Sequence, residues 1–480
     1  MHITKTTHLL ILLIVGLFVN AQGQILGYSK LVKETLYSSS VKDSVEVKVW
    51  LPRNYNSNNS YPVIYEFVYD HSDYIAATLN HLYQYPAAIV VHASFYPGTS
   101  YQKPTLSVQG EKYYQFVKDE LLPYIKKKYK TRHRTATGLS QGADYVNYIL
   151  RTNPELFDAY MIFAIEAPNY QADFAKYTDK LKEKKDYFIA IANDVKRRVK
   201  FANELHTNLS KSEKLNLVKK EYKSADHSYA MLYALADGLS FIYKDYVSYP
   251  DIKTGETLSQ YYSNMVTSLK KKYGTIKYNG LLIVILNKLT KETPKAEIKT
   301  LLKQLYKDNI NVKDIDFFNM GYALYQLKFY DLAEDAFKQS IVKGKALPAN
   351  KRAMQIRITY NMLARVYYRQ KAYDKVFATL QEGYKTTKIK YLLQRYAVYS
   401  LYVGGEKQIK KGIEALNTLM TLPKSTSPRN PEQPKELIYL IYAKSYWKLK
   451  NESESRKYLK MVLEINPQNK DALEFQKTIQ

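Results

Sequence analysis

A serine flanked by glycines is the clearest chemical feature of this sequence. Residues 138–142 read Gly-Leu-Ser-Gln-Gly, with Ser140 at the centre. A short strand is predicted just before it, at 134–137, and a helix just after it, from Gly142 to Arg151. Such a strand–turn–helix, called a nucleophile elbow, lifts a serine hydroxyl off the edge of a sheet, and the glycines leave room for the tight turn. The pattern predicts a nucleophilic serine, with the backbone N–H of Gln141 directed at the developing oxyanion.

A serine nucleophile also needs a general base and a carboxylate that orients the base. His227 lies in a polar stretch just before the helix predicted over 229–243, and we expect it to be the base. Asp194 follows the strand predicted over 187–192, where a loop at the end of the sheet would bring a carboxylate to the histidine. The chain order is then serine, acid, histidine, with Asp194 as the expected acid. The sequence leaves four alternative polar partners open: Asn193, Asp186, Glu204 and Asp226.

The elements that must position these residues alternate between short apolar strands and amphipathic helices from about residue 28 to 249. Strands that are apolar throughout are typical of a parallel sheet buried on both faces. Strands that alternate with helices predict an α/β fold with three layers, the sheet lying between two layers of helices. Strands are predicted at 45–51, 63–68, 87–91, 134–137 and 187–192, and helices at 113–129, 142–151 and 229–243.

Several segments besides the serine motif are similar to one family of esterases with the α/β-hydrolase fold. That family includes esterase D, bacterial enterobactin esterases, and feruloyl and acetyl-xylan esterases. The resemblance covers most of 45–243 and implies an α/β-hydrolase sandwich, a serine–acid–histidine triad, and no cofactor or metal ion. It rests on Leu51-Pro52 with Tyr55, on 61–65, on Phe116 with 120–125, on Thr131 and Arg134, on the serine motif, and on His227 with 238–241.

The chain departs from this family in three loops. Family members often have Asp-Gly after the strand matching 63–68, whereas here Asp70 is followed by His71. The resemblance implies a second oxyanion donor in this loop, so Asp70 and His71 are the expected residues. The loop 92–96 lacks the Asn and Arg of many relatives, and the acid loop 192–195 is also atypical. The substrate preference of the family therefore does not transfer to this chain.

After Asp251 the strands stop and the sequence predicts helical hairpins. Large and small residues recur along them as in tetratricopeptide repeats, in which small residues let paired helices approach closely. The tail thus resembles a tetratricopeptide-like helical repeat domain, with a generic helical bundle as the alternative. Three units match well, and a fourth matches weakly: Phe317, Met320, Gly321, Leu324, Ala333 and Phe337; Tyr360, Leu363, Ala364, Tyr367, Val376 and Leu380; Tyr439, Tyr442, Ala443, Tyr446, Ser455 and Leu459; and, weakly, Tyr396, Tyr399, Gly412 and Leu416.

The first residues, 1–21, combine a basic start, an apolar run and a small residue at the end, which predicts a signal peptide. A retained anchor is the alternative, although the run is short for a bilayer-spanning helix. We therefore predict an exported protein, periplasmic or secreted, without a stable membrane span. The predicted domains are the signal peptide (1–21), an α/β-hydrolase esterase domain (22–250), connecting helices (251–310) and helical repeats (311–480). We expect the esterase domain to fold without the tail.

The composition limits the chemistry and the partners. The 480 residues contain no cysteine, which excludes disulfides, thiol nucleophiles and thiolate metal sites. Lys and Arg number 72 against 45 Asp and Glu, and the resulting net charge of +27 attracts polyanions. These basic residues are spread along predicted helices without a nucleic-acid-binding motif. We therefore predict a solvated cationic surface and no nucleic-acid partner.

Together these features predict an exported serine esterase that hydrolyses a small or oligomeric carboxylic ester through an acyl-enzyme intermediate. The cationic surface favours an anionic ester, such as a siderophore or a carbohydrate-linked ester. The alternative is a non-catalytic interaction protein, in which the helical repeats bind a protein partner and the hydrolase domain is a scaffold. Ser140 would then be the elbow serine of an inactive relative, and His227 would be a surface histidine.

Overall fold

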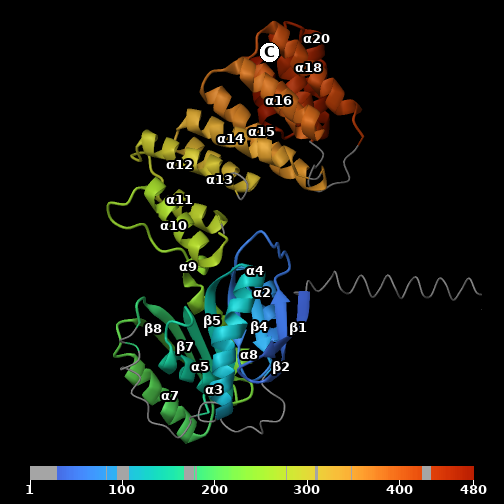
Figure 1. Cartoon of the computed structure of the whole chain (residues 1–480). Helices are drawn as coiled ribbons and strands as arrows, with labels where there is room; N and C mark the ends of the chain where they lie inside the picture. Colours follow the sequence, from blue (N-terminus) through green and yellow to red (C-terminus); the bar gives the residue numbers. More distant parts are fainter. Residues whose placement is uncertain are drawn as a thin grey trace, which may run out of the picture. The chain divides into compact units, whose positions relative to one another are not determined.

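The computed structural model describes residues 30–82, 84–94, 108–166, 178, 181–276, 278–308, 312–347, 349–423 and 434–479 (Figure 1). The predicted signal peptide, 1–21, lies outside these described residues. The chain forms two compact units. The first comprises the residues up to Asp251 together with Asn264–Lys277, and the second comprises Ile252–Ser263 and Tyr278–Gln480. The region predicted as the esterase domain, 22–250, therefore shares its unit with a later segment of the chain.

An eight-stranded sheet forms the centre of the first unit. Its strands are β1 (Lys30–Ser38), β2 (Asp43–Leu51), β3 (Tyr61–Glu66), β4 (Ile89–Ala93), β5 (Thr131–Leu139), β6 (Ala159–Phe163), β7 (Lys185–Ala192) and β8 (Leu215–Tyr222). The strand order is β1-β2-β4-β3-β5-β6-β7-β8. β2 pairs antiparallel with β1 and β4, and the strands from β4 to β8 are parallel. This mostly parallel sheet confirms the predicted α/β-hydrolase fold.

Helices cover both faces of the sheet (Figure 1). They are α2 (Ser72–His81), α3 (Val108–Gln115), η1 (Phe116–Leu121), α4 (Leu122–Tyr129), α5 (Gln141–Thr152), α7 (Lys196–Leu209), α8 (Ala230–Ile242) and α9 (Lys244–Val247). One core contains side chains of α3, η1, α4, α5 and α7 together with alternate strand residues such as Tyr65 and Ile189. Gly238 of α8 lies on the opposite face, against Met161 and Phe188. The sheet is therefore the middle layer of the predicted three.

Several elements differ from the sequence prediction. The strand predicted over 63–68 ends at Glu66, because Val68 turns away with φ 76°. The helix predicted over 113–129 begins earlier and contains a π-helical segment, η1, at its centre. β1, β6 and β8 were not predicted. The remaining predicted strands and helices of this unit agree with the structure to within a few residues.

The second unit is helical. Its elements are α10 (Leu258–Tyr273, as far as Ser263), α11 (Tyr278–Lys288), α12 (Lys295–Lys307), α13 (Asp314–Gln326), α14 (Tyr330–Lys345), α15 (Ala349–Arg369), α16 (Tyr373–Thr387), α17 (Lys390–Val403), α18 (Glu406–Thr421), α19 (Lys435–Lys448), α20 (Glu452–Ile465) and α21 (Lys470–Thr478). From α13 onward, successive helices pack in pairs. This region fits a helical repeat domain, and its assignment to the tetratricopeptide class stays a prediction. In the described part of the chain, no helix combines the length and the apolar character needed to cross a bilayer.

Candidate active site

Ser140 lies in a tight turn between β5 and α5. Its backbone angles are φ 57° and ψ −117°, a conformation that residues other than glycine rarely adopt. Backbone packs on backbone around this turn. A Cβ on Gly142 would lie 2.4 Å from the Phe67 carbonyl oxygen, and a Cβ on Gly138 would lie 2.4 Å from the Gly142 carbonyl carbon. The fold therefore requires both glycines of the motif in order to seat the serine.

The structure brings the predicted nucleophile, base and acid into one hydrogen-bonded chain. His227 Nε2 lies 2.8 Å from Ser140 Oγ. On the other side of the ring, His227 Nδ1 is hydrogen-bonded to Asp194 Oδ2. A neutral imidazole that donates its Nδ1 proton to Asp194 keeps a lone pair on Nε2, which can accept the serine proton. The geometry suits general-base activation of Ser140.

Parallel strands deliver these three residues to the same edge of the sheet. Ser140 follows β5, Asp194 follows β7 and His227 follows β8. The carboxyl ends of parallel strands meet at one edge, where active sites of α/β folds are built. The Asn193 N–H donates to the Ala225 carbonyl oxygen at 2.8 Å, which joins the acid loop to the histidine loop. The relative position of acid and base is thus fixed by the backbone.

The alternative acids have other partners. Asp226 accepts hydrogen bonds from backbone N–H groups in the turn that follows His227. Asp186 forms an ion pair with Lys244, and Glu204 lies 3.8 Å from a lysine of its own helix. Asp194 is therefore the carboxylate that the structure places on the imidazole Nδ1.

Asp194 lies in a strongly hydrogen-bonded environment. Its side chain is 7% exposed, and burial by itself raises the pKa of a carboxyl group. Hydrogen bonds from His227, from the Val195 N–H and from Arg198 outweigh that effect and hold the pKa of Asp194 below its usual value. Asp194 is therefore ionised at neutral pH, as the orienting acid must be.

Two charged residues that the sequence analysis missed complete the surroundings of Ser140. Glu166 follows β6, and its Oε2 lies 3.3 Å from Ser140 Oγ and 3.5 Å from His227 Nε2. Arg198, in the first turn of α7, donates to Glu166 Oε1 at 2.6 Å and to Asp194 Oδ1 at 3.0 Å. A prediction of β6 would have placed Glu166 at the carboxyl edge of the sheet, but that strand was not recognised. For Arg198, the only signal was its position four residues after Asp194, near the start of a helix that was not predicted.

The predicted oxyanion donors occupy different environments. Gln141 is the first residue of α5, so its N–H lies at the positive end of that helix, next to Ser140. The His71 N–H donates to both carboxylate oxygens of Glu66, at 2.9 and 2.8 Å, and is therefore committed to another acceptor. Asp70 lies in the same cluster as Glu66. The roles of Gln141 and Asp70 stay predictions, and a role for the His71 N–H would require its bonds to Glu66 to break.

Val68, in the loop between β3 and α2, lies against the elbow that holds Ser140. Its Cβ lies 3.7 Å from the place that a Cβ on Gly142 would take. The Tyr69 N–H donates back to the Phe67 carbonyl oxygen at 3.1 Å, and Val68, between them, has φ 76°. A β-branched residue at positive φ is strained, and such strain is concentrated at functional sites. Val68 is therefore a further candidate for the second oxyanion donor. Val68 was not predicted as a site residue because the strand was predicted to continue through it.

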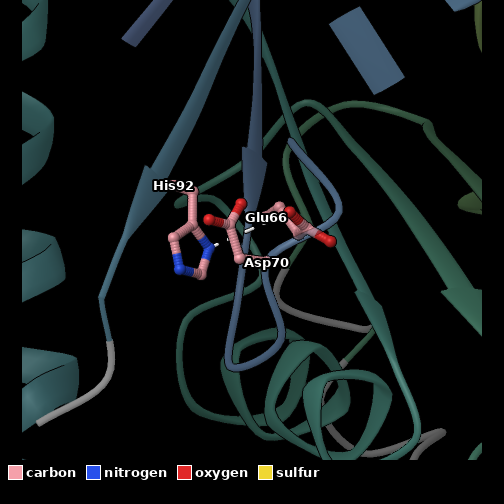
Figure 2. A group of neighbouring side chains, drawn as sticks. All are labelled: Glu66, Asp70 and His92. Atoms are coloured by element: carbon pink, nitrogen blue, oxygen red, sulfur yellow. Dashed lines mark ion pairs between the residues drawn. The ribbon is translucent and has the colours of Figure 1, made fainter. Parts of the chain in front are cut away.

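A cluster of two buried side chains, Glu66 and His92, and one exposed side chain, Asp70, lies at the loop between β3 and α2. Figure 2 shows Glu66, Asp70 and His92 pointing toward one another, and one ligand atom from each lies within 4.8 Å of the others. Burial raises the pKa of Glu66 to about 7, despite hydrogen bonds from His71. Burial also acts to raise the pKa of Asp70, but a 2.6 Å bond from Lys48 helps to lower it to about 2. Such donors can bind a divalent cation, but here Lys48 and His71 pair with the two carboxylates. The expectation that the protein needs no metal stays a prediction.

The part of the chain that carries the elbow and its partners matches a protein-family model. The model is described as "Putative esterase", and the match covers residues 38–230, including Ser140, Asp194 and His227. The resemblance predicted from the sequence is confirmed, and with it the prediction of a carboxylic ester hydrolase at the level of the family.

Solved structures similar to this chain include three hydrolases. An IroE-like serine hydrolase from Shewanella oneidensis is 20% identical with a TM-score of 0.43, and the match covers 62% of this chain and 99% of that chain. A CE1 ferulic acid esterase from Anaeromyces mucronatus is 21% identical with a TM-score of 0.38, covering 46% and 92%. A siderophore hydrolase from Aspergillus nidulans is 17% identical with a TM-score of 0.37, covering 45% and 94%. No curated protein sequence matches the chain.

Proposed function

We propose that the protein is an exported serine esterase in which Ser140, His227 and Asp194 form the catalytic triad. The observation that carries this proposal is the unbroken chain of hydrogen bonds from Ser140 Oγ through the imidazole to Asp194. Export is supported by the signal peptide predicted at 1–21.

In the first half of the reaction, Ser140 Oγ attacks the ester carbonyl carbon while its proton moves to His227 Nε2. The carbonyl π electrons move to the oxygen, and two backbone N–H groups, that of Gln141 in the elbow and that of Val68 in the loop after β3, stabilise the oxyanion. The intermediate collapses, the bond to the alcohol oxygen breaks, and His227 donates its proton to that oxygen. The acyl group remains on Ser140 as an ester.

In the second half, water takes the place of the alcohol. His227 accepts a proton from the water, whose oxygen attacks the acyl carbon. Collapse of the second intermediate returns the proton to Ser140 Oγ and releases the carboxylic acid. Asp194 stays ionised throughout and stabilises the imidazolium in both halves, in keeping with its lowered pKa.

The substrate that we propose is a small or oligomeric ester outside the cytoplasm. The net charge of +27 favours an anionic one, such as a siderophore ester or a carbohydrate-linked ester. The helical repeats are proposed to contact a protein partner, because arrays of this kind offer extended binding surfaces.

Hydrolysis of 4-nitrophenyl butyrate by the full chain tests the catalytic proposal. We expect Ser140→Ala and His227→Ala each to lower kcat by about 10³-fold or more, since triad members act as a unit. Ser224→Ala, an exposed serine in the histidine loop, is the matched control and should keep wild-type turnover. Wild-type turnover in Ser140→Ala would show that the proposed triad is wrong, and no turnover in the wild type on any ester of a broad panel would favour the non-catalytic alternative.

A further inference from the structure

The side chain of Glu166 occupies a place that the reaction needs. In the mechanism above, His227 Nε2 must give a proton to the alcohol oxygen of the ester, so that oxygen must lie within hydrogen-bond reach of Nε2 and beside Ser140 Oγ. Glu166 Oε2 now lies 3.5 Å from that nitrogen and 3.3 Å from that hydroxyl. A carboxylate here also opposes the negative charge that develops on the oxyanion. Productive binding of an ester therefore requires Glu166 to move away.

Arginines hold Glu166 in this place. Arg198 donates to Glu166 Oε1 at 2.6 Å, and Arg197 lies 3.7 Å from the same oxygen and donates to the Glu166 backbone carbonyl at 3.2 Å. Both arginines belong to the first turn of α7, whose positive end adds to their charge. The carboxylate is therefore bound as an anionic ligand would be.

Arg198 remains in the site when Glu166 leaves. Its Nη1 donates to Asp194 Oδ1 at 3.0 Å, and Asp194 is in turn held by His227. Among the described residues, Arg198 Nε is buried without a hydrogen-bond partner. Departure of Glu166 would thus leave a fixed guanidinium beside the reacting atoms with donors to spare. A new carboxylate restores the charge balance, whereas an ammonium group would add to an excess of positive charge.

We propose that Glu166 stands in for a carboxylate of the substrate, and that Arg198 and Arg197 bind this carboxylate when the ester displaces Glu166. This inference rests on the proposed function. Because Glu166 Oε2 lies near the place of the alcohol oxygen while Oε1 contacts Arg198, the substrate carboxylate lies a few bonds from that oxygen, on the alcohol side. The substrate class is an ester whose alcohol part is a hydroxy acid.

A matched set of butyrate esters tests this assignment. O-butyryl lactate and isopropyl butyrate share the acyl group and differ only by a carboxylate in place of a methyl group, and butyryl-β-methylcholine supplies a cationic arm. We expect the full wild-type chain to show a kcat/KM for the lactate ester about 10- to 100-fold above that for the isopropyl ester, the range of a charge-assisted hydrogen bond. Arg198→Gln should remove most of this ratio. The ratio of the two kcat/KM values isolates the carboxylate contact, because loss of the Arg198 bond to Asp194 lowers turnover of both esters alike and leaves their ratio unchanged.

Glu166→Ala gives the complementary result. Removal of the competing carboxylate should raise kcat/KM several-fold for the lactate and isopropyl esters, whereas Glu204→Ala, an exposed control on α7, should change neither. Equal kcat/KM for the two esters in the wild type, or a preference for the choline ester that Glu166→Ala abolishes, would overturn the assignment.

Calorimetry separates this inference from the proposed function. Ser140→Ala should bind O-butyryl lactate at least about 10-fold more tightly than isopropyl butyrate, and Ser140→Ala/Arg198→Gln should lose that difference. If Ser140→Ala still turns over ester, the proposed triad is wrong. If Ser140→Ala is inactive but binds both esters equally, only the carboxylate subsite is wrong.

Discussion

At the scale of single residues, Asp194 joins two parts of the site, because one carboxylate oxygen contacts His227 and the other contacts Arg198. We expect Asp194→Asn to lower kcat by about 10³-fold or more, since an amide leaves the imidazole in the wrong tautomer. Asp226→Asn, next to the histidine in sequence but bonded to the following turn, is the matched control and should stay within about threefold of wild type. Ester hydrolysis measures both, and the reverse result would move the acid to Asp226.

His133 provides a residue-scale prediction about acid stability. It is buried in β5 against the rings of Tyr243 and Tyr273. Burial lowers the pKa of His133 to about 4, and the nearby Lys272 adds to that effect, while Asp158, Asp186 and Asp245 act against it. The unfolded chain, with a histidine pKa near 6.5, binds this proton more readily than the folded chain does. Stability is therefore lost as the pH falls from about 6.5 to about 4.

We expect His133→Phe to reduce that loss. Between pH 7 and pH 4.5, the free energy of unfolding of wild type should fall by about 2–3 kcal/mol more than that of the variant. Urea denaturation at the two pH values measures this change in the free energy of unfolding. His81→Gln, at the exposed end of α2, is the control and should behave as wild type. An equal loss in wild type and His133→Phe would show that this histidine is not the acid-sensitive group.

The sequence could place Ser140, His227 and Asp194 because a strained turn leaves a motif and the other two follow in a set order. Glu166 and Arg198 were not found because they belong to no motif. Glu166 and Arg198 have no distinguishing sequence context, and they meet only because the folded sheet places the end of β6 beside the start of α7. Contacts that depend on tertiary packing alone have no local pattern.

At the scale of elements, too, features with a local sequence pattern could be predicted and features set by tertiary packing could not. Buried strands such as β7 and amphipathic helices such as α5 show clear periodicity, and both were predicted close to their observed bounds. β6 is only five residues long, and β8 is partly exposed and carries two lysines and a glutamate. The end of β3 was misplaced because Val68 favours a strand by propensity, whereas packing on the elbow imposes φ 76°.

Helix pairing in the tail gives an element-scale prediction. A Cβ on Gly321 of α13 would lie 2.8 Å from the Phe337 ring of α14. We expect Gly321→Ala to destabilise the helical unit by about 1–3 kcal/mol, because the ring must leave its preferred position. Thermal unfolding followed by circular dichroism measures the loss. Gly321→Ala should cost less stability in a Phe337→Leu background than in the wild type, because the smaller side chain leaves room for the added methyl group. Equal costs in the two backgrounds would mean that the two helices do not meet there.

At the scale of the whole molecule, the first compact unit extends further along the chain than residue 250, where the predicted esterase domain ends. Asn264–Lys277 belongs to this unit. In it, Lys272 forms a 2.9 Å ion pair with Asp245, and the Tyr273 ring lies 5.5 Å from that of Tyr243. The expectation that the esterase domain, predicted at 22–250, folds without the tail therefore omits packing that the structure shows.

We expect a fragment that ends after Lys277 to be soluble and to hydrolyse 4-nitrophenyl butyrate, because it keeps this packing. A fragment that ends at Ser248 should aggregate or unfold at a lower temperature, since it exposes His133 and Tyr243. Size-exclusion chromatography and esterase assays compare the two fragments. Tyr273→Ala in the full chain should reproduce part of the destabilisation, and equal stability of both fragments would show that the added segment is dispensable.

The segment Asn264–Lys277 is synthesised after the whole sheet that it packs on. By Asp251 the ribosome has made all eight strands of the sheet, but Tyr273 is still missing. Positions 252 to 277 add 26 residues, which take about 1–5 s at ~5–20 residues per second. Throughout that interval the aromatic surface around Tyr243 lacks the ring that packs on it in the folded protein.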